Sequence, residues 1–240
     1  MHGYIIHERL NIMNNQVDDA LLEHMMSFCS ENKQDLINTI VPIRTKYLTV
    51  VLEDIFQPQN ASAVVRSCEC FGVQDIHVIE NENEFSPNPK IVIGSSKWVD
   101  IHKYSEEENN TIATLKELKS KGYRIIATTP HEKDATIDEI DIEAGPMALV
   151  FGSEQPGISD LAREHADEFV KIPMHGFTES FNISVSAAIC LYELTKRIRS
   201  NENIDWKLTD QEQRLLKYDW AKKVVKYSEQ IEERYINERK

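Results

Sequence analysis

The sequence predicts an α/β fold in which a parallel β-sheet is covered by helices on both faces. Strand-length apolar runs alternate with helix-length segments from residue 47 to residue 199, and this alternation is typical of β-α-β units that build a parallel sheet. The runs are rich in valine, isoleucine and leucine, as buried parallel strands are. A hydrophobic content of 41% is enough for one such core.

The predicted core elements follow one another in a regular order. Strands are expected at five places, residues 47–52, 76–79, 124–129, 147–151 and 168–172. Helices are expected between and after them, at residues 61–71, 106–121 and 183–199. Asn60 is expected to cap the first of these helices, and Gly72 and Gly122 stand where the first two should end.

Helical segments are predicted on both sides of this core. Residues 16–40 carry apolar side chains at the i, i+3, i+4, i+7 spacing of an amphipathic helix, and residues 208–239 are helical by composition and strongly charged. We therefore expect three parts, namely an N-terminal helical extension (residues 1–45), a central α/β domain (46–199) and a C-terminal helical extension (200–240).

Composition narrows the class of protein further. The formal net charge of −13 argues against a general nucleic-acid binder, because neutralising phosphates requires lysine and arginine, although a local basic site remains open. The four cysteines have neither disulfide-framework nor zinc-ligand spacing. No run reaches the roughly 18 apolar residues of a membrane span, and the N-terminus lacks a signal-peptide layout. The sequence thus predicts a soluble, cytoplasmic protein without a bound metal.

Three polar clusters stand at predicted strand-to-helix transitions. Asn60 and Arg66 lie at a helix start rich in small residues, residues 152–157 form a glycine-flanked turn around a carboxylate, and Asn182 and Ser184 begin the last core helix. Taken singly, each has an ordinary explanation as a helix cap or a turn. Nucleotide-binding glycine motifs, zinc-protease motifs and serine-hydrolase elbows are absent from the sequence.

In this order and spacing, the clusters resemble the three motifs of the SpoU/TrmH family of RNA ribose 2′-O-methyltransferases, in the SPOUT superfamily. The resemblance extends from about Val50 to Leu194. The third motif is matched by residues 172–174 together with residues 180–185, where Phe181 replaces the usual leucine. Residues 94–99 and the helical flanks resemble the branch that methylates guanosine 18 of tRNA.

The resemblance implies a parallel-sheet SPOUT fold with a C-terminal trefoil knot, S-adenosylmethionine as methyl donor, tRNA as substrate and a homodimer. The residues implied to bind the cofactor through their backbone are Thr128, Gly152, Ile172, Met174 and Phe181. The residues implied to be catalytic are Asn60, Arg66, Glu154, Asn182 and Ser184.

The implied reaction is attack of a ribose 2′-hydroxyl on a sulfonium methyl group, with guanosine 18 in the D-loop as the expected site. Arg66 matches the residue sometimes regarded as the base, but a guanidinium with a pKa above about 12 is a poor proton acceptor. We expect Arg66 instead to bind the neighbouring phosphate and to stabilise the developing alkoxide, oriented by Glu154 and Asn60.

Other functions remain open on the sequence alone. The chain could methylate another tRNA position or ribosomal RNA, act as a SPOUT-fold RNA-binding protein without activity, or be an unrelated α/β nucleotide-binding module. Positive charge for RNA docking is expected on the helical flanks, at Arg44, Lys46, Lys196, Arg197, Arg199, Lys222 and Lys223.

Overall fold

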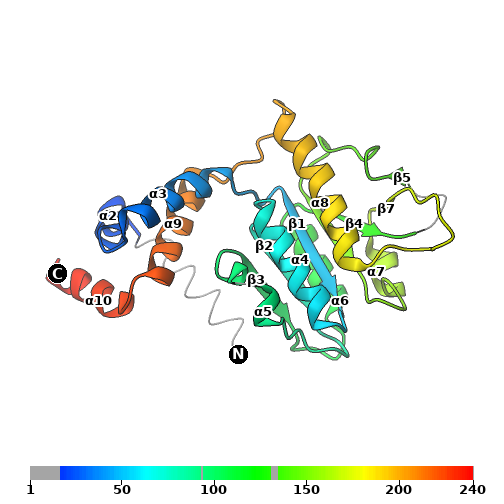
Figure 1. The fold of residues 1–240 in the computed structure, drawn as a ribbon, viewed down its shortest axis with the longest axis horizontal. Helices are drawn as coiled ribbons and strands as arrows, with labels where there is room; N and C mark the ends of the chain where they lie inside the picture. Colours follow the sequence, from blue (N-terminus) through cyan, green and yellow to red (C-terminus); the bar gives the residue numbers. More distant parts are fainter. Residues whose placement is uncertain (1–16, 93, 131–134, 240) are drawn as a thin grey trace. The chain divides into compact units, whose positions relative to one another are not determined.

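The computed structural model describes residues 17–92, 94–130 and 135–239 of the 240-residue chain (Figure 1). It divides into two compact units: the segments before residue 45 and after residue 206 form a helical unit, and residues 45–206 form an α/β unit. The two segments that the sequence assigns to separate extensions therefore belong to one unit. Residues 1–16 of the expected N-terminal extension lie outside the described residues.

The α/β unit contains a seven-stranded parallel sheet in the order β3-β2-β1-β6-β4-β7-β5. The strands are β1 (Leu48–Glu53), β2 (Asp75–Ile79), β3 (Asp100–Tyr104), β4 (Arg124–Thr128), β5 (Ala135–Thr136), β6 (Met147–Phe151) and β7 (Glu168–Lys171). The five predicted strands are confirmed to within two residues. The sequence did not predict β3 and β5, because β3 is only half-buried and lacks an apolar run, and β5 has two residues.

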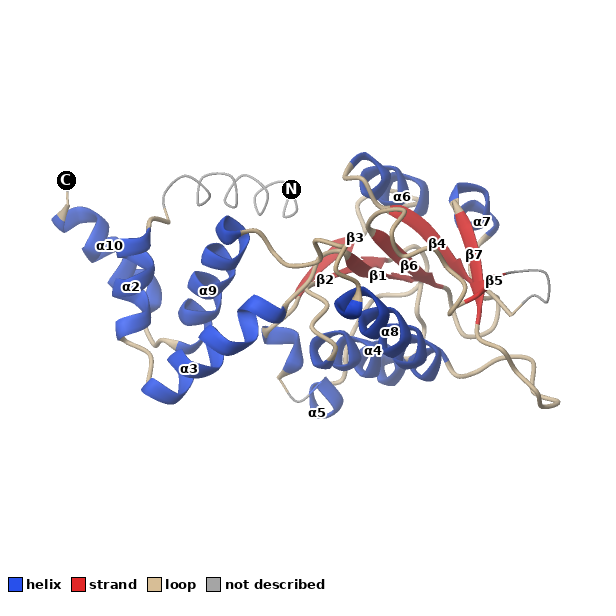
Figure 2. Ribbon diagram, turned by 90° about the horizontal axis from the view of Figure 1, so that it is seen from above, coloured by secondary structure: helices blue, strands red, loops and turns tan. Residues whose placement is uncertain are grey.

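Helices cover both faces of the sheet (Figure 2). The helices of one face are α4 (Pro58–Cys70) and α8 (Ile183–Ser200), and those of the other are α6 (Thr111–Ser120) and α7 (Asp160–His165). Alternate side chains of β1 serve the two faces: Val50 and Leu52 join the core under α4 and α8, and Val51 joins the core under α6 and α7. The predicted α/β class is thereby confirmed, and the trefoil knot stays a prediction.

Two helix starts differ from the prediction. α4 begins at Pro58 with Gln57 as its N-cap, so the predicted capping role of Asn60 is wrong. Proline is favoured in the first helical turn, where its missing N–H costs no hydrogen bond. α6 begins at Thr111 rather than Glu106, and the Asn110 side chain, which the helical pattern did not single out, is hydrogen-bonded to the backbone oxygens of Glu80 and Glu107.

Two short helices lie against α4, namely α5 (Pro89–Val92) and the 3-10 helix η2 (Ser95–Lys97). The backbone N–H of Asn88, directly before α5, donates to the Ser62 hydroxyl of α4 over 2.6 Å. Gly94 separates the two short helices with φ of +82°, a left-handed conformation that glycine adopts without strain. These contacts fix α5 and η2 beside the middle of α4.

A polar cluster is buried where β2 and β3 face α6. His102 Nε2 lies 2.9 Å from Asp75 Oδ1, and the rings of His77 and His102 stack with centroids 4.8 Å apart. Burial, followed by the charge of His102, lowers the pKa of His77 to about 3. Burial opposes ionisation of Asp75, but the hydrogen bond from His102 and the charge of Lys46 outweigh it and lower its pKa to about 2.

The helical unit contains α2 (Asp19–Ser27), α3 (Glu31–Ile40), the 3-10 helix η1 (Val41–Ile43), α9 (Asp210–Val224) and α10 (Ser228–Glu238). The single helix predicted over residues 16–40 is thus two helices, since Ser30 takes an extended conformation and starts the second. A capping box between Thr209 and Glu212 begins α9. Among the described helices of the chain, none is long and apolar enough to cross a membrane.

Candidate active site

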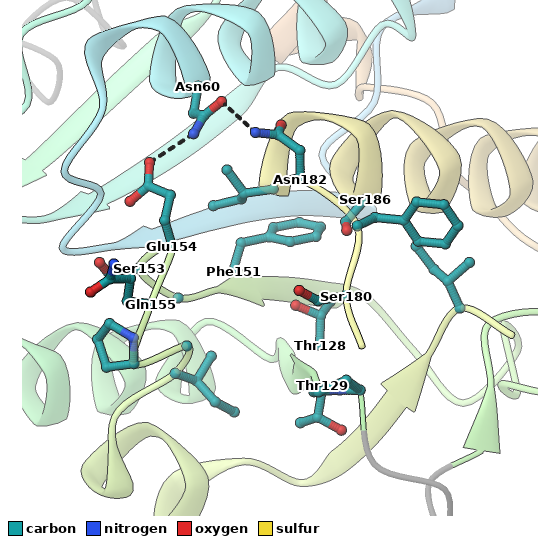
Figure 3. A pocket seen from close by; sticks show the side chains of 18 of the residues that line it. Asn60, Thr128, Thr129, Phe151, Ser153, Glu154, Gln155, Ser180, Asn182 and Ser186 are labelled. Carbon is teal, nitrogen blue, oxygen red and sulfur yellow. Dashed lines mark hydrogen bonds between the residues drawn. The ribbon is translucent and has the colours of Figure 1, made fainter. Parts of the chain in front are cut away.

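A cavity of about 520 Å³ lies at the carboxyl ends of β6, β4 and β7 (Figure 3). This is the edge of a parallel sheet at which α/β proteins bind ligands, and the volume suits a small organic molecule. Its walls are the ends of these strands, the loop after β6, the segment after β7 and the first turns of α8. The second and third predicted motifs therefore meet in one pocket.

The loop after β6 folds tightly onto itself. A Cβ atom on Gly152 would lie 2.1 Å from the carbonyl carbon of Gly157, far inside contact distance, so only glycine fits. The Gly157 N–H donates to the Ser153 carbonyl over 3.0 Å, and Gly157 itself takes φ of +73°. The two glycines of the second motif thus build a compact wall of backbone.

A buried carboxylate fixes the far end of this wall. Glu53, at the end of β1, is 2% exposed and accepts hydrogen bonds from the backbone N–H of Ser159 (2.9 Å), its hydroxyl (2.7 Å) and the Thr111 hydroxyl (2.7 Å). Ser159 in turn caps α7 by accepting from the Ala162 N–H. Sequence reasoning missed Glu53, although a carboxylate that ends a buried apolar strand is a usable signal.

A chain of hydrogen bonds joins the three motifs (Figure 3). The Asn182 amide donates to Asn60 Oδ1 over 3.0 Å, and the Asn60 amide donates to Glu154 Oε1 over 2.8 Å. Asn182 Oδ1 accepts from the backbone N–H and the hydroxyl of Ser184, at 2.9 and 2.6 Å, and so caps α8. The four predicted residues Asn60, Glu154, Asn182 and Ser184 therefore form one network.

Glu154 also holds the start of α4. Its two oxygens accept from the backbone N–H groups of Phe56 (3.2 Å) and Gln57 (3.1 Å), the residues directly before the helix. The contact exists because β1 pairs with β6, with Leu52 opposite Phe151, which brings the loops after these strands together. Burial opposes ionisation, but the hydrogen bonds from Asn60, Gln57 and Phe56 prevail and hold the pKa of Glu154 below its ordinary value.

Arg66 lies apart from this network. Its side chain is exposed on α4, outside the residues that line the cavity. Glu154 and Asn60 are hydrogen-bonded to each other and to the residues around them, and among their hydrogen bonds to described residues none is to Arg66. The structure thus gives no support to the expectation that Glu154 and Asn60 orient Arg66 directly. Both are connected to it through α4.

The five residues expected to hold the cofactor, Thr128, Gly152, Ile172, Met174 and Phe181, all line the cavity. The Thr128 hydroxyl donates to the Val150 carbonyl over 2.8 Å. Lining residues outside the predicted site include Gln57, Thr129, Arg163, Ser186 and Cys190. Within the described part of the chain, no cluster of histidine, cysteine and acidic side chains is suited to hold a metal ion.

Most cations expected to dock RNA are engaged within the protein. Arg44 is fully buried with its guanidinium 5.7 Å from the Trp220 ring, so its expected role in RNA docking is wrong. Arg197 donates to two backbone carbonyls, and Arg199 donates to the carbonyl of Phe71. The remaining contacts are Lys46 with Asp75, Lys196 over Tyr192, Lys222 with Glu232 and Lys223 with Asp219.

Residues 47–192 match the model of the SpoU rRNA Methylase family. The chain belongs to this family. The expectation drawn from the three motifs is confirmed, and this SpoU family member places them around one pocket.

Relatives of this SpoU family member include tRNA-modifying enzymes. It is 41% identical to the tRNA (guanosine(18)-2′-O)-methyltransferase of Borreliella burgdorferi, over 90% of this chain and 98% of that protein. The corresponding enzyme of Thermus thermophilus is 32% identical over 70% of this chain and 84% of its own length. The crystal structure of the A. aeolicus TrmH/SpoU tRNA modifying enzyme superposes with a TM-score of 0.72 at 31% identity, covering 82% of this chain and 98% of that one.

The methyl donor of SpoU methyltransferases is S-adenosylmethionine, and the structure of the SpoU methyltransferase AviRb contains it. AviRb resembles this chain with a TM-score of 0.57 and 25% identity, over 67% of this chain and 64% of that one. The pocket fits such a ligand: its volume is sufficient, and its combination of apolar side chains with a few polar groups suits an adenosine moiety.

Proposed function

We propose that this chain transfers a methyl group from S-adenosylmethionine to the ribose 2′-hydroxyl of guanosine 18 in tRNA. The observation that carries this proposal is the joining of all three motifs at one pocket, in a chain that is 41% identical to a tRNA (guanosine(18)-2′-O)-methyltransferase over 98% of that enzyme. Family, pocket and relatives all favour the same reaction.

Different residues of the chain have different roles in this reaction. Thr128, Gly152, Ile172, Met174 and Phe181 would hold the donor. When bound, S-adenosylmethionine supplies a methyl group already activated by the positive charge on sulfur. The Glu154–Asn60–Asn182 network fixes the first turn of α4 against the pocket. Arg66, an exposed and permanently charged side chain on the same helix, is suited to bind the adjacent phosphate and to stabilise the alkoxide that forms from the hydroxyl.

The test is methyl transfer from labelled S-adenosylmethionine to unmodified tRNA transcripts. We expect label in a transcript with guanosine at position 18, and none in the same transcript carrying 2′-deoxyguanosine there, because the nucleophile is missing. Label at another nucleotide, or on ribosomal RNA only, would overturn the assignment to guanosine 18. Donor binding without transfer to any RNA would favour a non-catalytic RNA-binding protein.

A comparison of two Arg66 variants tests the role assigned to this residue. Arg66→Ala should lose at least tenfold in kcat, since no other described cation lies on that stretch of α4. If a generic positive charge is sufficient, Arg66→Lys restores most of the rate. If the bidentate geometry of the guanidinium is required, lysine fails as well. Full activity of the alanine variant would exclude Arg66 from the reaction.

We also propose that the chain forms a homodimer through the exposed side of α8. Ile183, Ala187 and Leu191 on the inner side of this helix are in the core. The outer side is apolar as well: Phe181, just before the helix, is 41% exposed, Val185 44% and Tyr192 56%. Val185 and Tyr192 are seven residues apart, or two helical turns, and thus on one face. Such a stripe beside a pocket is typical of an interface between subunits.

Light scattering on size-exclusion fractions tests this proposal. The wild-type protein should elute at twice the mass of one chain, and Val185→Glu should shift it towards the monomer, because a charge cannot be buried unpaired at an apolar interface. Ala113→Glu, at an exposed position of α6 on the other face of the sheet, is the control and should remain dimeric. A monomeric wild-type protein, or a Val185→Glu dimer as stable as the control, would overturn it.

A further inference from the structure

The net charge of −13 makes RNA binding depend on local clusters of cations. The helical flanks do not supply the expected cluster, since the cations predicted there are buried or engaged with carboxylates, carbonyls or rings. The surface around Arg66 offers a different one. Lys90 on α5 and Lys97 on η2 are exposed, and among the described residues neither forms an ion pair.

The packing of the short helices brings these lysines towards Arg66. Both α5 and η2 contact α4. The Ser62 hydroxyl, which accepts from the Asn88 N–H over 2.6 Å, lies one helical turn before Arg66 on the same side of α4. Lys90 follows Asn88 by two residues, and Lys97 follows the turn at Gly94. Both lysine side chains therefore project from backbone that lies near the Ser62 and Arg66 side of α4. Long, flexible side chains of this kind reach several ångströms further into solvent.

We infer that Arg66, Lys90 and Lys97 form a phosphate-binding patch, the α4–α5–η2 patch, that holds the RNA backbone next to the methylated ribose. This inference rests on the proposed function. The partner is an RNA backbone rather than an acidic protein because the patch includes Arg66, the residue assigned to the phosphate of the target nucleotide. The carboxylates of Glu82 and Glu84 are exposed on the loop before α5, so the backbone is expected to run over α4 and η2 and away from that loop.

Residues 94–99 have a different role from the three motifs. They lie outside the cavity lining, and they place Lys97 at the surface beside α4. The left-handed Gly94 and the buried Ser95 provide the turn, and Lys97 provides the charge. A turn of this kind contributes to substrate binding without any part in donor binding.

The test is the salt dependence of binding to an unmodified transcript of a tRNA with guanosine at position 18. Lys90→Ala and Lys97→Ala are compared with Lys116→Ala, which removes a charge that is also exposed, from α6 on the opposite face of the sheet. The slope of log K against log[salt] is negative, and each patch variant should reduce its magnitude by about 0.7 to 0.9, equivalent to roughly fivefold weaker binding at 0.15 M salt. Lys116→Ala should bind as the wild type does.

Affinity for S-adenosylmethionine, measured by calorimetry in the same variants, should stay at the wild-type value. A reduced slope in both patch variants but not in the control supports the patch. Slopes equal to that of Lys116→Ala, in a protein that still methylates the tRNA, overturn the patch and leave the proposed function intact. A wild-type protein that binds donor but no tRNA overturns the proposed function, and the patch with it.

Discussion

The substitution Glu154→Gln tests whether the charge of this carboxylate holds α4 at the pocket. Glu154 accepts three hydrogen bonds, from Asn60 at 2.8 Å, Gln57 at 3.1 Å and Phe56 at 3.2 Å. Glutamine has nearly the same shape but replaces one acceptor oxygen with an amide donor. In its better orientation the amide oxygen keeps the bonds to Asn60 and Gln57, and the NH₂ group then faces the N–H of Phe56.

The magnitude follows from these three bonds. One charge-assisted hydrogen bond is lost, and the two that remain become bonds to a neutral acceptor, which are about half as strong. Phe56 is 68% exposed, so water replaces part of the lost bond. At the low end of the usual range, about 1.5 kcal/mol for each charge-assisted bond, halving the bonds to Asn60 and Gln57 costs about 1.5 kcal/mol, and the exposed bond to Phe56 adds little. A loss of this size in the positioning of α4, which carries Asn60 and Arg66, corresponds to about a tenfold lower kcat.

The assay is steady-state methylation of the tRNA transcript, with the melting temperature measured in parallel. Glu202→Gln, an exposed carboxylate in the turn after α8, removes the same charge away from the pocket and serves as the control. We expect a tenfold lower kcat for Glu154→Gln and wild-type values for the control. If Glu154→Gln keeps the wild-type kcat and melting temperature, the carboxylate does not anchor α4 and the reasoning fails.

Two further predictions concern the pocket wall and the buried histidine. Gly152→Ala should abolish donor binding measured by calorimetry, because its Cβ would meet the Gly157 backbone at 2.1 Å; retained affinity would show that the loop can open. Since the pKa of His77 is lowered to about 3, the unfolded chain takes up a proton below about pH 6.5 that the folded chain does not. The free energy of unfolding should therefore fall by up to about 2 kcal/mol between pH 6.5 and 5, as measured by urea denaturation. His77→Gln should remove that part of the slope, and an unchanged slope would refute the assignment.

The sequence predicted the core strands well because each is a short apolar run between turn residues, and burial on both faces requires such a run. β3 was not predicted for the opposite reason, because it is a half-exposed strand at the edge of the sheet. Its residues, Asp100 to Tyr104, contain neither an apolar run nor a clear alternation of polar and apolar side chains. The break between α2 and α3 lies where the apolar spacing stops: residues 30–35 are all polar, and Ser30 is the N-cap of α3, a signal that sequence reasoning missed.

That the five residues expected to hold the donor line one cavity is consistent with their positions in the sequence: Thr128 ends β4, the others follow β6 or β7, and parallel strands end at one edge of the sheet. Glu53 and the roles of Asn60 and Glu154 were not predictable from local pattern. Their partners are 58 to 122 residues away in the sequence, and no short-range periodicity encodes a contact over that separation.

By itself, the sequence determined the order of strands and helices and the residues of the three motifs, because propensity and burial pattern act over a few neighbouring positions. Only the tertiary structure decided what those residues touch. The pairing of β1 with β6 brings Glu154 to the start of α4, and burial of Arg44 beside Trp220 removes it from the surface. Hydrogen bonds and solvent exposure depend on distances in space, and the order of strands in the sheet sets those distances.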